Sequence, residues 1–171
     1  MNIFLIGYRC TGKTVVGRAL AARLGMEFVD ADDYLVEKAG KTIKEIFAED
    51  GEPAFRDLEE ECMGELAGRD GLVVAAGGGA VMRQANVDYM KGSGKVVLLE
   101  ADADTIYSRI TTDPKTGAQR PDLTDKDQYD EIVHLLEHRK PFYDAAADLT
   151  LNSAELSPQE LVARIVGEIH R

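Results

Sequence analysis

The chain begins with a short apolar run that leads directly into a glycine-containing loop, GYRCTGKT. Ile3 to Ile6 is apolar throughout, and Gly7 to Thr14 matches the pattern GxxxxGK[ST] in full. Downstream, Val16, Leu20 and Leu24 recur at intervals of four residues, which indicates a helix, and a glycine suited to end it follows at once. A buried strand, a phosphate-binding loop and a helix in this order predict an α/β domain on a parallel sheet.

Short apolar runs alternate with helical patterns along the rest of the chain. The runs that we expect to form the remaining strands are Phe28–Val29, Leu72–Ala76, Val96–Leu99 and Asp148–Leu151. The residues from Tyr34 to about Gly68 have a mostly helical pattern that is too long for a simple crossover. We therefore expect a helical insertion at the edge of the domain, after the second strand.

The second half of the chain contains one long polar segment and two further helices. Thr111–Thr124 is fourteen residues long and contains two prolines and a glycine, which is typical of a lid over a binding site. A helix with Ile132 and Leu135 is expected to be disturbed near Pro141. The last helix begins at Ser157-Pro158-Gln159-Glu160, a capping box with proline at the first helical position.

The charge and the cysteines exclude several classes of protein. Lys and Arg total 20 and Asp and Glu total 31, so the formal net charge is −11. This balance disfavours nucleic acid and anionic membrane as partners, but not an anionic ligand in a locally positive cleft. Cys10 and Cys62 form no metal-binding motif, and two cysteines are too few for a disulfide framework, so we expect reduced thiols in the cytoplasm.

The loop itself predicts a site for a nucleoside triphosphate. Glycines let backbone N–H groups turn toward phosphate oxygens, and the following helix N-terminus adds partial positive charge. Lys13 can reach the β- and γ-phosphates, and the Thr14 hydroxyl can bind Mg²⁺. The residues assigned to phosphate binding are Gly7, Cys10, Thr11, Gly12, Lys13, Thr14 and Val15. The loop does not reveal whether the γ-phosphate goes to water, to a small molecule or nowhere.

Further motifs resemble those of the shikimate kinase family, in the same order along the chain. They are Asp30-Ala31-Asp32, Phe55-Arg56-Asp57-Leu58-Glu59, Gly77-Gly78-Gly79-Ala80-Val81, Arg120-Pro121 and Arg139-Lys140-Pro141-Phe142-Tyr143. The resemblance implies a three-layer P-loop kinase fold, similar to the nucleoside monophosphate kinases. In that fold a five-stranded parallel sheet is flanked by helices, with a helical substrate-binding insertion and a lid. The implied reaction is Mg²⁺-dependent transfer of the ATP γ-phosphate to the 3-hydroxyl of shikimate, in the route to chorismate and the aromatic amino acids.

The resemblance also assigns residues to the acceptor. Arg56 and Arg139 match arginines that hold the shikimate carboxylate, a task suited to the planar guanidinium fork. Asp32 matches the carboxylate that contacts the reacting hydroxyl and could accept its proton. Gly77, Gly78 and Gly79 would let the backbone approach the substrate. From the residues alone, Arg56 could instead form an ion pair along its helix and Arg139 could be an exposed helix residue.

The remaining assignments concern the metal and the nucleotide. Asp30 matches a residue near Mg²⁺, acting with Thr14, and we expect Asp33 to cap the following helix. Arg120 matches the lid arginine at the transferring phosphoryl group, so that it joins Asp32 and Lys13 as a catalytic residue. Arg109 matches the position that stacks on adenine, with the segment from Asn152 to Pro158 as the opposite wall.

The chain is expected to be a single domain over residues 1–171. Its core is assigned to 1–30, 69–110 and 146–171, the insertion to about 31–62, and the lid to about 111–124. We expect ATP, ADP and shikimate as partners, no nucleic acid or membrane partner, and a monomer. Two alternatives are a related kinase for gluconate or a nucleoside monophosphate, and a nucleotide-binding regulatory protein that performs no transfer.

Overall fold

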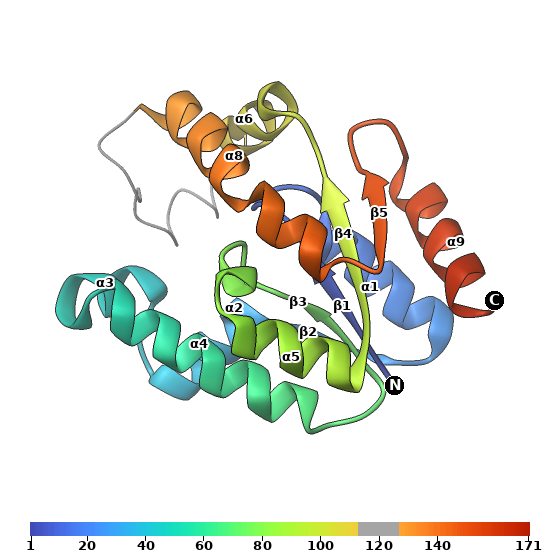
Figure 1. The fold of residues 1–171 in the computed structure, drawn as a ribbon, viewed down its shortest axis with the longest axis horizontal. Helices are drawn as coiled ribbons and strands as arrows, with labels where there is room; N and C mark the ends of the chain where they lie inside the picture. Colours follow the sequence, from blue (N-terminus) through green and yellow to red (C-terminus); the bar gives the residue numbers. More distant parts are fainter. Residues whose placement is uncertain (113–126) are drawn as a thin grey trace.

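Five parallel strands form the centre of the fold, in the order β2-β3-β1-β4-β5 (Figure 1). The computed structural model describes residues 1–112 and 127–171. The strands are β1 (Asn2–Ile6), β2 (Glu27–Asp30), β3 (Leu72–Ala75), β4 (Gly94–Glu100) and β5 (Leu149–Asn152). All five overlap the runs expected from the sequence, so the predicted five-stranded parallel sheet is confirmed.

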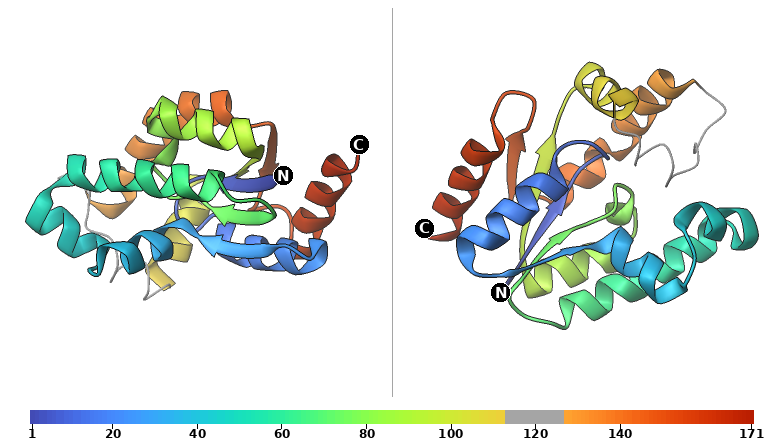
Figure 2. Two further views of the ribbon diagram at one scale, coloured as in Figure 1. Left: turned by 90° about the horizontal axis from the view of Figure 1, so that it is seen from below. Right: turned by 180° about the vertical axis from the view of Figure 1, so that it is seen from behind.

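Helices cover both faces of the sheet, which makes three layers (Figure 2). Alternate residues of β1 point to opposite faces. Ile3 and Leu5 pack with α1 (Lys13–Leu24) and α9 (Pro158–Ile169). Phe4 and Ile6 belong to the other core, which is formed with α4 (Glu52–Ala67), α5 (Gln84–Ser93) and α8 (Gln128–Ala146). Because β1 is buried on both faces, its residues Ile3–Ile6 are all apolar and do not alternate with polar residues.

The insertion after β2 is helical, as the sequence predicts. It consists of α2 (Ala31–Ala39), α3 (Ile43–Asp50) and α4. A small apolar core of its own contains Leu35, Ile46 and Phe55. These helices extend to one side of the sheet, across from α6 (Ala103–Thr112) and α8 (Figure 1).

The cap of α2 differs from the expectation. The N-cap residue is Asp30, whose Oδ1 accepts hydrogen bonds from the backbone N–H groups of Asp32 and Asp33 at 2.9 and 3.1 Å. The prediction that Asp33 caps this helix is therefore wrong. The helix begins at Ala31, directly after the strand, so Asp33 already lies within its first turn, where an acidic side chain is favourable to the helix dipole.

The helix that contains Pro141 is not interrupted there. α8 continues past Pro141 to Ala146 although a proline in a helix interior costs about 3 kcal/mol. The residues beyond the proline are held by tertiary packing, since Tyr143 and Ala146 are buried against the sheet. By contrast, the capping box at Ser157 and Glu160 is formed as predicted at the start of α9.

The described helices include none with the length and apolar character needed to cross a membrane.

Candidate active site

The phosphate-binding loop follows β1 at the carboxyl edge of the sheet, where parallel α/β sheets place their ligands. Gly7 has φ +140°, and a Cβ atom on this residue would collide with the carbonyl oxygen of Leu99. Gly12, with φ +97°, is the N-cap of α1, so the loop ends at a helix N-terminus. Both glycines are therefore required by the backbone, and the loop delivers Lys13 and Thr14 into the first turn of α1.

A cavity of about 550 Å³ opens between this loop, the start of α2, the end of β3 and the loop after β5. Its lining includes most residues that the sequence assigns to ATP. The assigned residues found there are Cys10, Thr11, Gly12, Lys13, Thr14, Val15, Arg109 and Pro158. Gly7 does not line the cavity, but its carbonyl oxygen accepts a hydrogen bond from Lys13 Nζ at 2.5 Å.

Hydrogen bonds within the loop fix its shape. Lys13 Nζ also donates to the carbonyl oxygen of Tyr8 at 2.8 Å, and Thr11 Oγ1 donates to the same oxygen at 2.8 Å. The Thr11 side chain is buried in the turn. The ammonium group of Lys13 is therefore held over the first two residues of the loop, on the cavity side.

Thr14 and Asp30 meet across the gap between α1 and β2. Thr14 Oγ1 donates a hydrogen bond of 3.4 Å to Asp30 Oδ2, and both residues line the cavity. Burial raises the pKa of Asp30, and the nearby negative charges of Asp32 and Asp33 raise it further, against the effect of the two backbone hydrogen bonds. A hydroxyl and a desolvated carboxylate are hard oxygen donors that suit Mg²⁺.

These two residues do not form a complete metal cage. Within the described ranges, no group of three or more His, Cys, Asp or Glu side chains is placed to hold a metal ion. Mg²⁺ in nucleotide sites is usually held by one or two protein oxygens, with phosphate oxygens and water completing the shell. The Thr14–Asp30 pair therefore fits the metal that the sequence implies.

Asp32 lies in the first turn of α2, and it lines the same cavity as Gly77 and Gly78. Its position follows from the cap at Asp30, which fixes the start of α2 through the Asp32 N–H group. A carboxylate here faces the space between the phosphate-binding loop and the glycine turn after β3. A carboxylate at this place can accept a proton from a group bound beside the loop.

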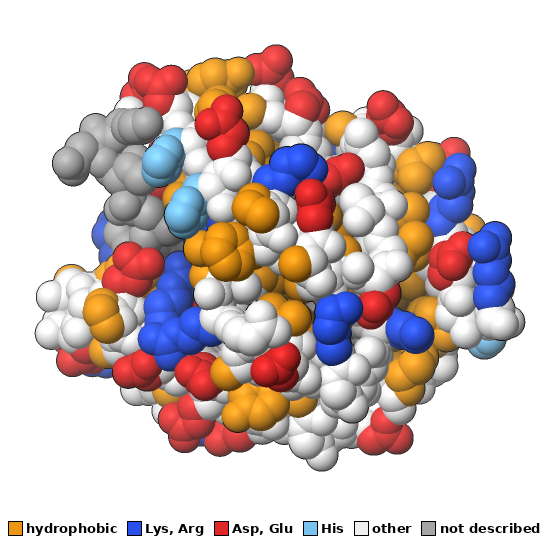
Figure 3. All heavy atoms as spheres, viewed as in Figure 1, with side chains coloured by type: hydrophobic (Ala, Val, Ile, Leu, Met, Phe, Trp, Pro, Cys, Tyr) orange, Lys and Arg blue, Asp and Glu red, His pale blue; other side chains and the backbone are white. Residues whose placement is uncertain are grey.

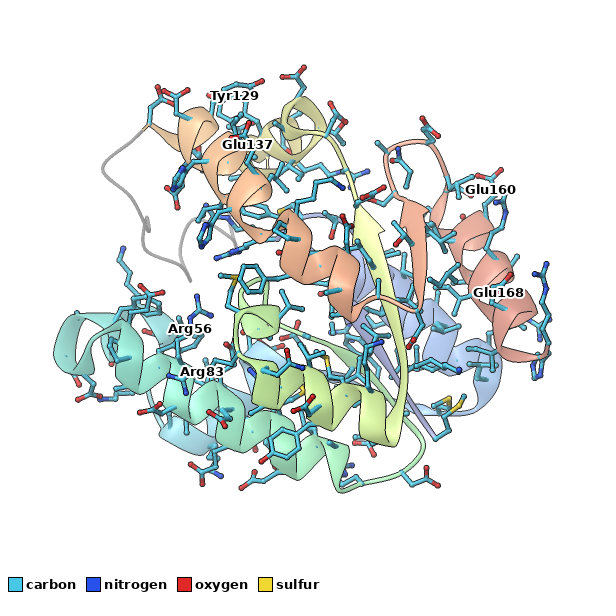
Figure 4. All side chains as sticks on the ribbon, in the orientation of Figure 1. Arg56, Arg83, Tyr129, Glu137, Glu160 and Glu168 are labelled. Carbon is cyan, nitrogen blue, oxygen red and sulfur yellow. The ribbon has the colours of Figure 1, made fainter. Side chains whose placement is uncertain are left out.

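Arg56, on α4, lies against the glycine turn, which consists of Gly77, Gly78 and Gly79. A Cβ atom on Gly79 would fall 2.6 Å from Arg56 Nη1 and Nη2, so the guanidinium occupies the space that a side chain would need. Arg56 also forms the ion pair along its own helix, with Glu59 at 3.0 Å and a longer contact to Glu52 at 3.5 Å. Figure 4 shows Arg56 on α4 near Arg83, which pairs with Asp57 and Glu60.

Arg139 approaches the same turn from α8. Its side chain is 6% exposed, so the alternative of an exposed helix arginine is wrong. Arg139 Nη1 lies 3.1 Å from the position of a Cβ atom on Gly78, and its guanidinium carbon lies 5.6 Å from the centre of the Tyr8 ring. One helical turn further, Tyr143 donates a hydrogen bond of 2.5 Å to the Gly78 carbonyl oxygen. The turn is thus held between α4 and α8.

Arg109 connects the phosphate-binding loop to the loop after β5. Its Nη1 donates to the Cys10 carbonyl oxygen at 3.0 Å, and its Nη2 donates to the Ser153 carbonyl oxygen at 2.9 Å. Cys10 has φ +62°, an unfavourable value for a residue with a side chain. Arg109 therefore braces a strained position of the loop while it lines the nucleotide cavity.

The structure brings together most of the residues assigned from the sequence, in two adjoining groups. Arg56, Gly79 and Arg139 do not line the cavity, but they surround the glycine turn at its border. Arg120 and residues 113–124 of the expected lid lie outside the described residues. Sequence reasoning missed Arg9, although it stands within the loop motif, whereas Ser153 lies in the segment 152–158 expected opposite Arg109.

Charge is unevenly distributed over the molecule. On the face drawn in Figure 3, acidic side chains are spread around the outline, whereas basic side chains form one larger group between the insertion and two histidines. Lys13 and Arg109 line the cavity, and Arg56 and Arg139 lie at its border. Asp30 and Asp32 line the same cavity, so basic and acidic side chains share it, and the basic ones could bind an anionic ligand.

The sequence is similar to those of known proteins. A family model described as shikimate kinase matches residues 9–170. Shikimate kinase of Rhodopirellula baltica is 38% identical over 165 residues, covering 96% of this chain and 88% of the relative. That of Nitratidesulfovibrio vulgaris is 42% identical over 146 residues, covering 85% and 83%.

Solved structures give the same result. Shikimate kinase from Acinetobacter baumannii in complex with shikimate superposes with a TM-score of 0.91 at 35% identity, covering 98% of this chain and 92% of that one. The enzyme from Bacteroides thetaiotaomicron gives a TM-score of 0.90 at 35% identity, covering 100% and 99%. The chain therefore belongs to the shikimate kinase family, the ATP-dependent phosphotransferases with an alcohol acceptor.

Proposed function

We propose that this chain transfers the γ-phosphate of ATP to the 3-hydroxyl of shikimate, giving shikimate 3-phosphate and ADP. The observation that carries the proposal is the placement of two arginines, Arg56 and Arg139, against Gly79 and Gly78 at the border of the nucleotide cavity. A pair of guanidinium groups at one turn suits the carboxylate of a small polyhydroxy acid. The reaction belongs to the route to chorismate and the aromatic amino acids.

Each group at the site has a separate task in this mechanism. The N-terminus of α1 and Lys13 bind the phosphates, while Arg56 and Arg139 orient the acceptor through its carboxylate. The 3-hydroxyl oxygen then attacks the γ-phosphorus, and the bond to the β–γ bridging oxygen breaks as ADP leaves. The hydroxyl proton passes to the carboxylate of Asp32.

Mg²⁺ would be held by Thr14 Oγ1 and, directly or through water, by the carboxylate of Asp30. When bound, the ion neutralises charge on the β- and γ-phosphate oxygens. Its binding would also offset the cost of the buried Asp30 charge. Arg120, which lies outside the described residues, is proposed to act on the transferring phosphoryl group from a lid at about 111–124.

The boundaries and partners inferred from the sequence are part of this proposal. The insertion at about 31–62 would contribute Asp32 and Arg56 to the acceptor side, and the core at 1–30, 69–110 and 146–171 would carry the ATP site and the glycine turn. The net charge of −11 supports a protein without nucleic-acid or membrane partners. We propose a cytoplasmic monomer that exchanges ATP, ADP and shikimate with solvent.

A coupled assay of ADP release tests the proposed acceptor. The protein is supplied with ATP and Mg²⁺, and then separately with shikimate, gluconate, CMP or AMP. Shikimate alone is expected to stimulate ADP release. Stimulation by gluconate or a nucleotide in place of shikimate would contradict the proposal, and no stimulation by any acceptor would favour a nucleotide-binding protein that performs no transfer.

A further inference from the structure

Arg9 is a basic residue of the phosphate-binding loop to which the proposed mechanism gives no task. It is the third residue of the motif that begins at Gly7, and it lines the nucleotide cavity with Lys13 and Asp32. Its side chain is half-buried, and its guanidinium carbon lies 5.8 Å from the centre of the Tyr8 ring. Arg9 is therefore held at the cavity by a cation–π contact.

The surroundings of Arg9 contain a second arginine as well as acidic side chains. Tyr8 is 2% exposed, and the guanidinium carbon of Arg139 lies 5.6 Å from the centre of the same ring. Burial raises the pKa of the Tyr8 hydroxyl, and the positive charges of Arg9 and Arg139 oppose that rise, whereas the buried Glu131 adds to it. Two guanidinium groups thus converge on one buried ring, close to Lys13.

The other arginines of the site have partners within the described part of the chain. Arg56 is paired with Glu59, and Arg109 donates to backbone carbonyl oxygens. Over residues 1–112 and 127–171, no ion pair involves Arg9, and its guanidinium group interacts with the Tyr8 side chain. Holding several like charges together has a cost, which an anionic ligand would offset.

The position of Arg9 indicates which anionic group it would bind. Lys13 Nζ donates to the carbonyl oxygens of Gly7 and Tyr8, the two residues directly before Arg9. The lysine of such a loop reaches the β- and γ-phosphates, and Asp32 marks the acceptor side of the same cavity. Arg9 therefore lines the same cavity as Lys13 and Asp32, the two residues between which the terminal phosphate is expected.

We propose that Arg9 is a catalytic residue that contacts the γ-phosphoryl group of ATP. The inference rests on the proposed function and adds one residue to it. Arg9 forms and breaks no covalent bond and transfers no proton. Its guanidinium donates hydrogen bonds to the equatorial phosphate oxygens, and these bonds strengthen as charge develops there during transfer.

Binding of ATP and of ADP, each with Mg²⁺, tests the contact without any acceptor. Arg9→Met is expected to weaken ATP binding about tenfold, while ADP binding changes less than about twofold, because only ATP carries the γ-phosphate. Arg9→Lys keeps the charge and is expected to retain part of the ATP preference. Steady-state kinetics with shikimate should show a lower kcat for Arg9→Met, with little change in the KM for shikimate.

Arg18→Met is the matched control. Arg18 also lies beside an aromatic ring, 5.1 Å from the centre of Phe28, but it is exposed on α1 and does not line the cavity. This variant is expected to bind ATP and ADP as the wild type does. Circular dichroism and thermal unfolding of each variant establish that it is folded before its binding is compared.

Two results would overturn the inference. If Arg9→Met weakened the binding of ATP and of ADP equally, Arg9 would stabilise the loop and would not contact the γ-phosphate. A rise in the KM for shikimate with unchanged ATP binding would show that Arg9 binds the acceptor carboxylate. Because the ATP and ADP measurements need no acceptor, they remain decisive for Arg9 even if shikimate proves not to be the substrate.

Discussion

The guanidinium group of Arg56 fills the space where Gly79 has no side chain, with Nη1 and Nη2 each 2.6 Å from the position of an added Cβ atom. The backbone of Gly79 has φ −100°, which any residue can adopt. The glycine is therefore required here because Arg56 passes beside it. The relationship couples the glycine turn directly to one of the two arginines proposed to bind the acceptor.

Gly79→Ala is expected to displace Arg56 rather than to unfold the protein, because the colliding atoms are at the end of a flexible side chain. We predict a rise of about tenfold in the KM for shikimate, which corresponds to about 1.4 kcal/mol, with little change in ATP affinity. Gly92→Ala is the control. Gly92 lies in α5 with nothing within 4 Å of an added Cβ atom, so alanine should stabilise the fold by up to about 1 kcal/mol. An unchanged KM in Gly79→Ala would contradict the coupling.

Arg139→Lys tests whether the planar fork, and not charge alone, binds the acceptor. Lysine keeps the positive charge but cannot form two parallel hydrogen bonds to a carboxylate. We predict a KM for shikimate raised about tenfold and an ATP dissociation constant within about twofold of the wild type. Arg164→Lys, an exposed change on α9, is the control. Equal shikimate KM values for Arg139→Lys and the wild type would show that this arginine does not act as a bidentate ligand.

Asp30 combines two tasks that substitutions can separate. Asn caps helices about as well as Asp, whereas loss of the cap costs about 1 kcal/mol. Asp30→Asn removes only the charge, and Asp30→Ala removes the cap as well. Without Mg²⁺ at pH 7, we predict that Asp30→Asn has a higher free energy of unfolding than the wild type, and that Asp30→Ala lies about 1 kcal/mol below Asp30→Asn. Both variants should bind Mg²⁺-ATP more weakly.

The sign of the pH dependence follows from the raised pKa of Asp30, for which burial is the largest cause. A carboxyl whose pKa is higher in the folded than in the unfolded state destabilises the fold when it is charged. This penalty in the free energy of unfolding is absent below the unfolded-state pKa of about 3.9. It develops as the pH rises from there through the folded-state pKa, and it is constant at higher pH. Urea unfolding at several pH values should therefore show that Asp30→Asn raises the free energy of unfolding at pH 7 and that this difference disappears near pH 3.

Arg109 is expected to act on ATP through the loop as well as through any contact with adenine. Arg109→Lys loses most of the hydrogen bonds to Cys10 and Ser153, each worth about 1 kcal/mol. We predict weaker binding of both ATP and ADP and a lower Tm. A variant with weaker nucleotide binding but unchanged Tm would indicate that Arg109 serves the adenine alone. The KM for shikimate is the internal control, because Arg109 does not contact the glycine turn.

Much of the fold follows from local sequence signals. The buried run of β1, the loop motif and the capping box at Ser157 each depend on neighbouring residues, and each is where the sequence places it. The predictions that differ from the structure are those for the cap of α2 and for the helix at Pro141. The first depends on which of several neighbouring residues caps the helix, and the second on packing against residues distant in the sequence. Asp30 rather than Asp33 caps α2 because the strand ends one residue before the helix. The sequence around Pro141 carries no sign of the buried contacts that keep α8 continuous.

The same division applies to the site. Motifs identified Lys13, Asp32 and Arg139, but not how the side chains share the space around the glycine turn. The hydrogen bond from Tyr143 to Gly78 and the contacts of Arg109 with Ser153 join residues far apart in the chain. No local pattern encodes such pairs, since only the folded sheet brings their elements together.

The central claim is that Asp32 assists direct transfer of the γ-phosphate to shikimate, and a single-turnover experiment tests it most directly. Enzyme in excess is mixed with γ-labelled ATP, Mg²⁺ and shikimate, and labelled shikimate phosphate is followed with time. The wild type is predicted to move the label to shikimate in step with ADP formation. Asp32→Asn is predicted to bind ATP with unchanged affinity but to transfer the label about 100-fold more slowly. Transfer at the wild-type rate by Asp32→Asn, or label released only as inorganic phosphate by the wild type, would contradict the account.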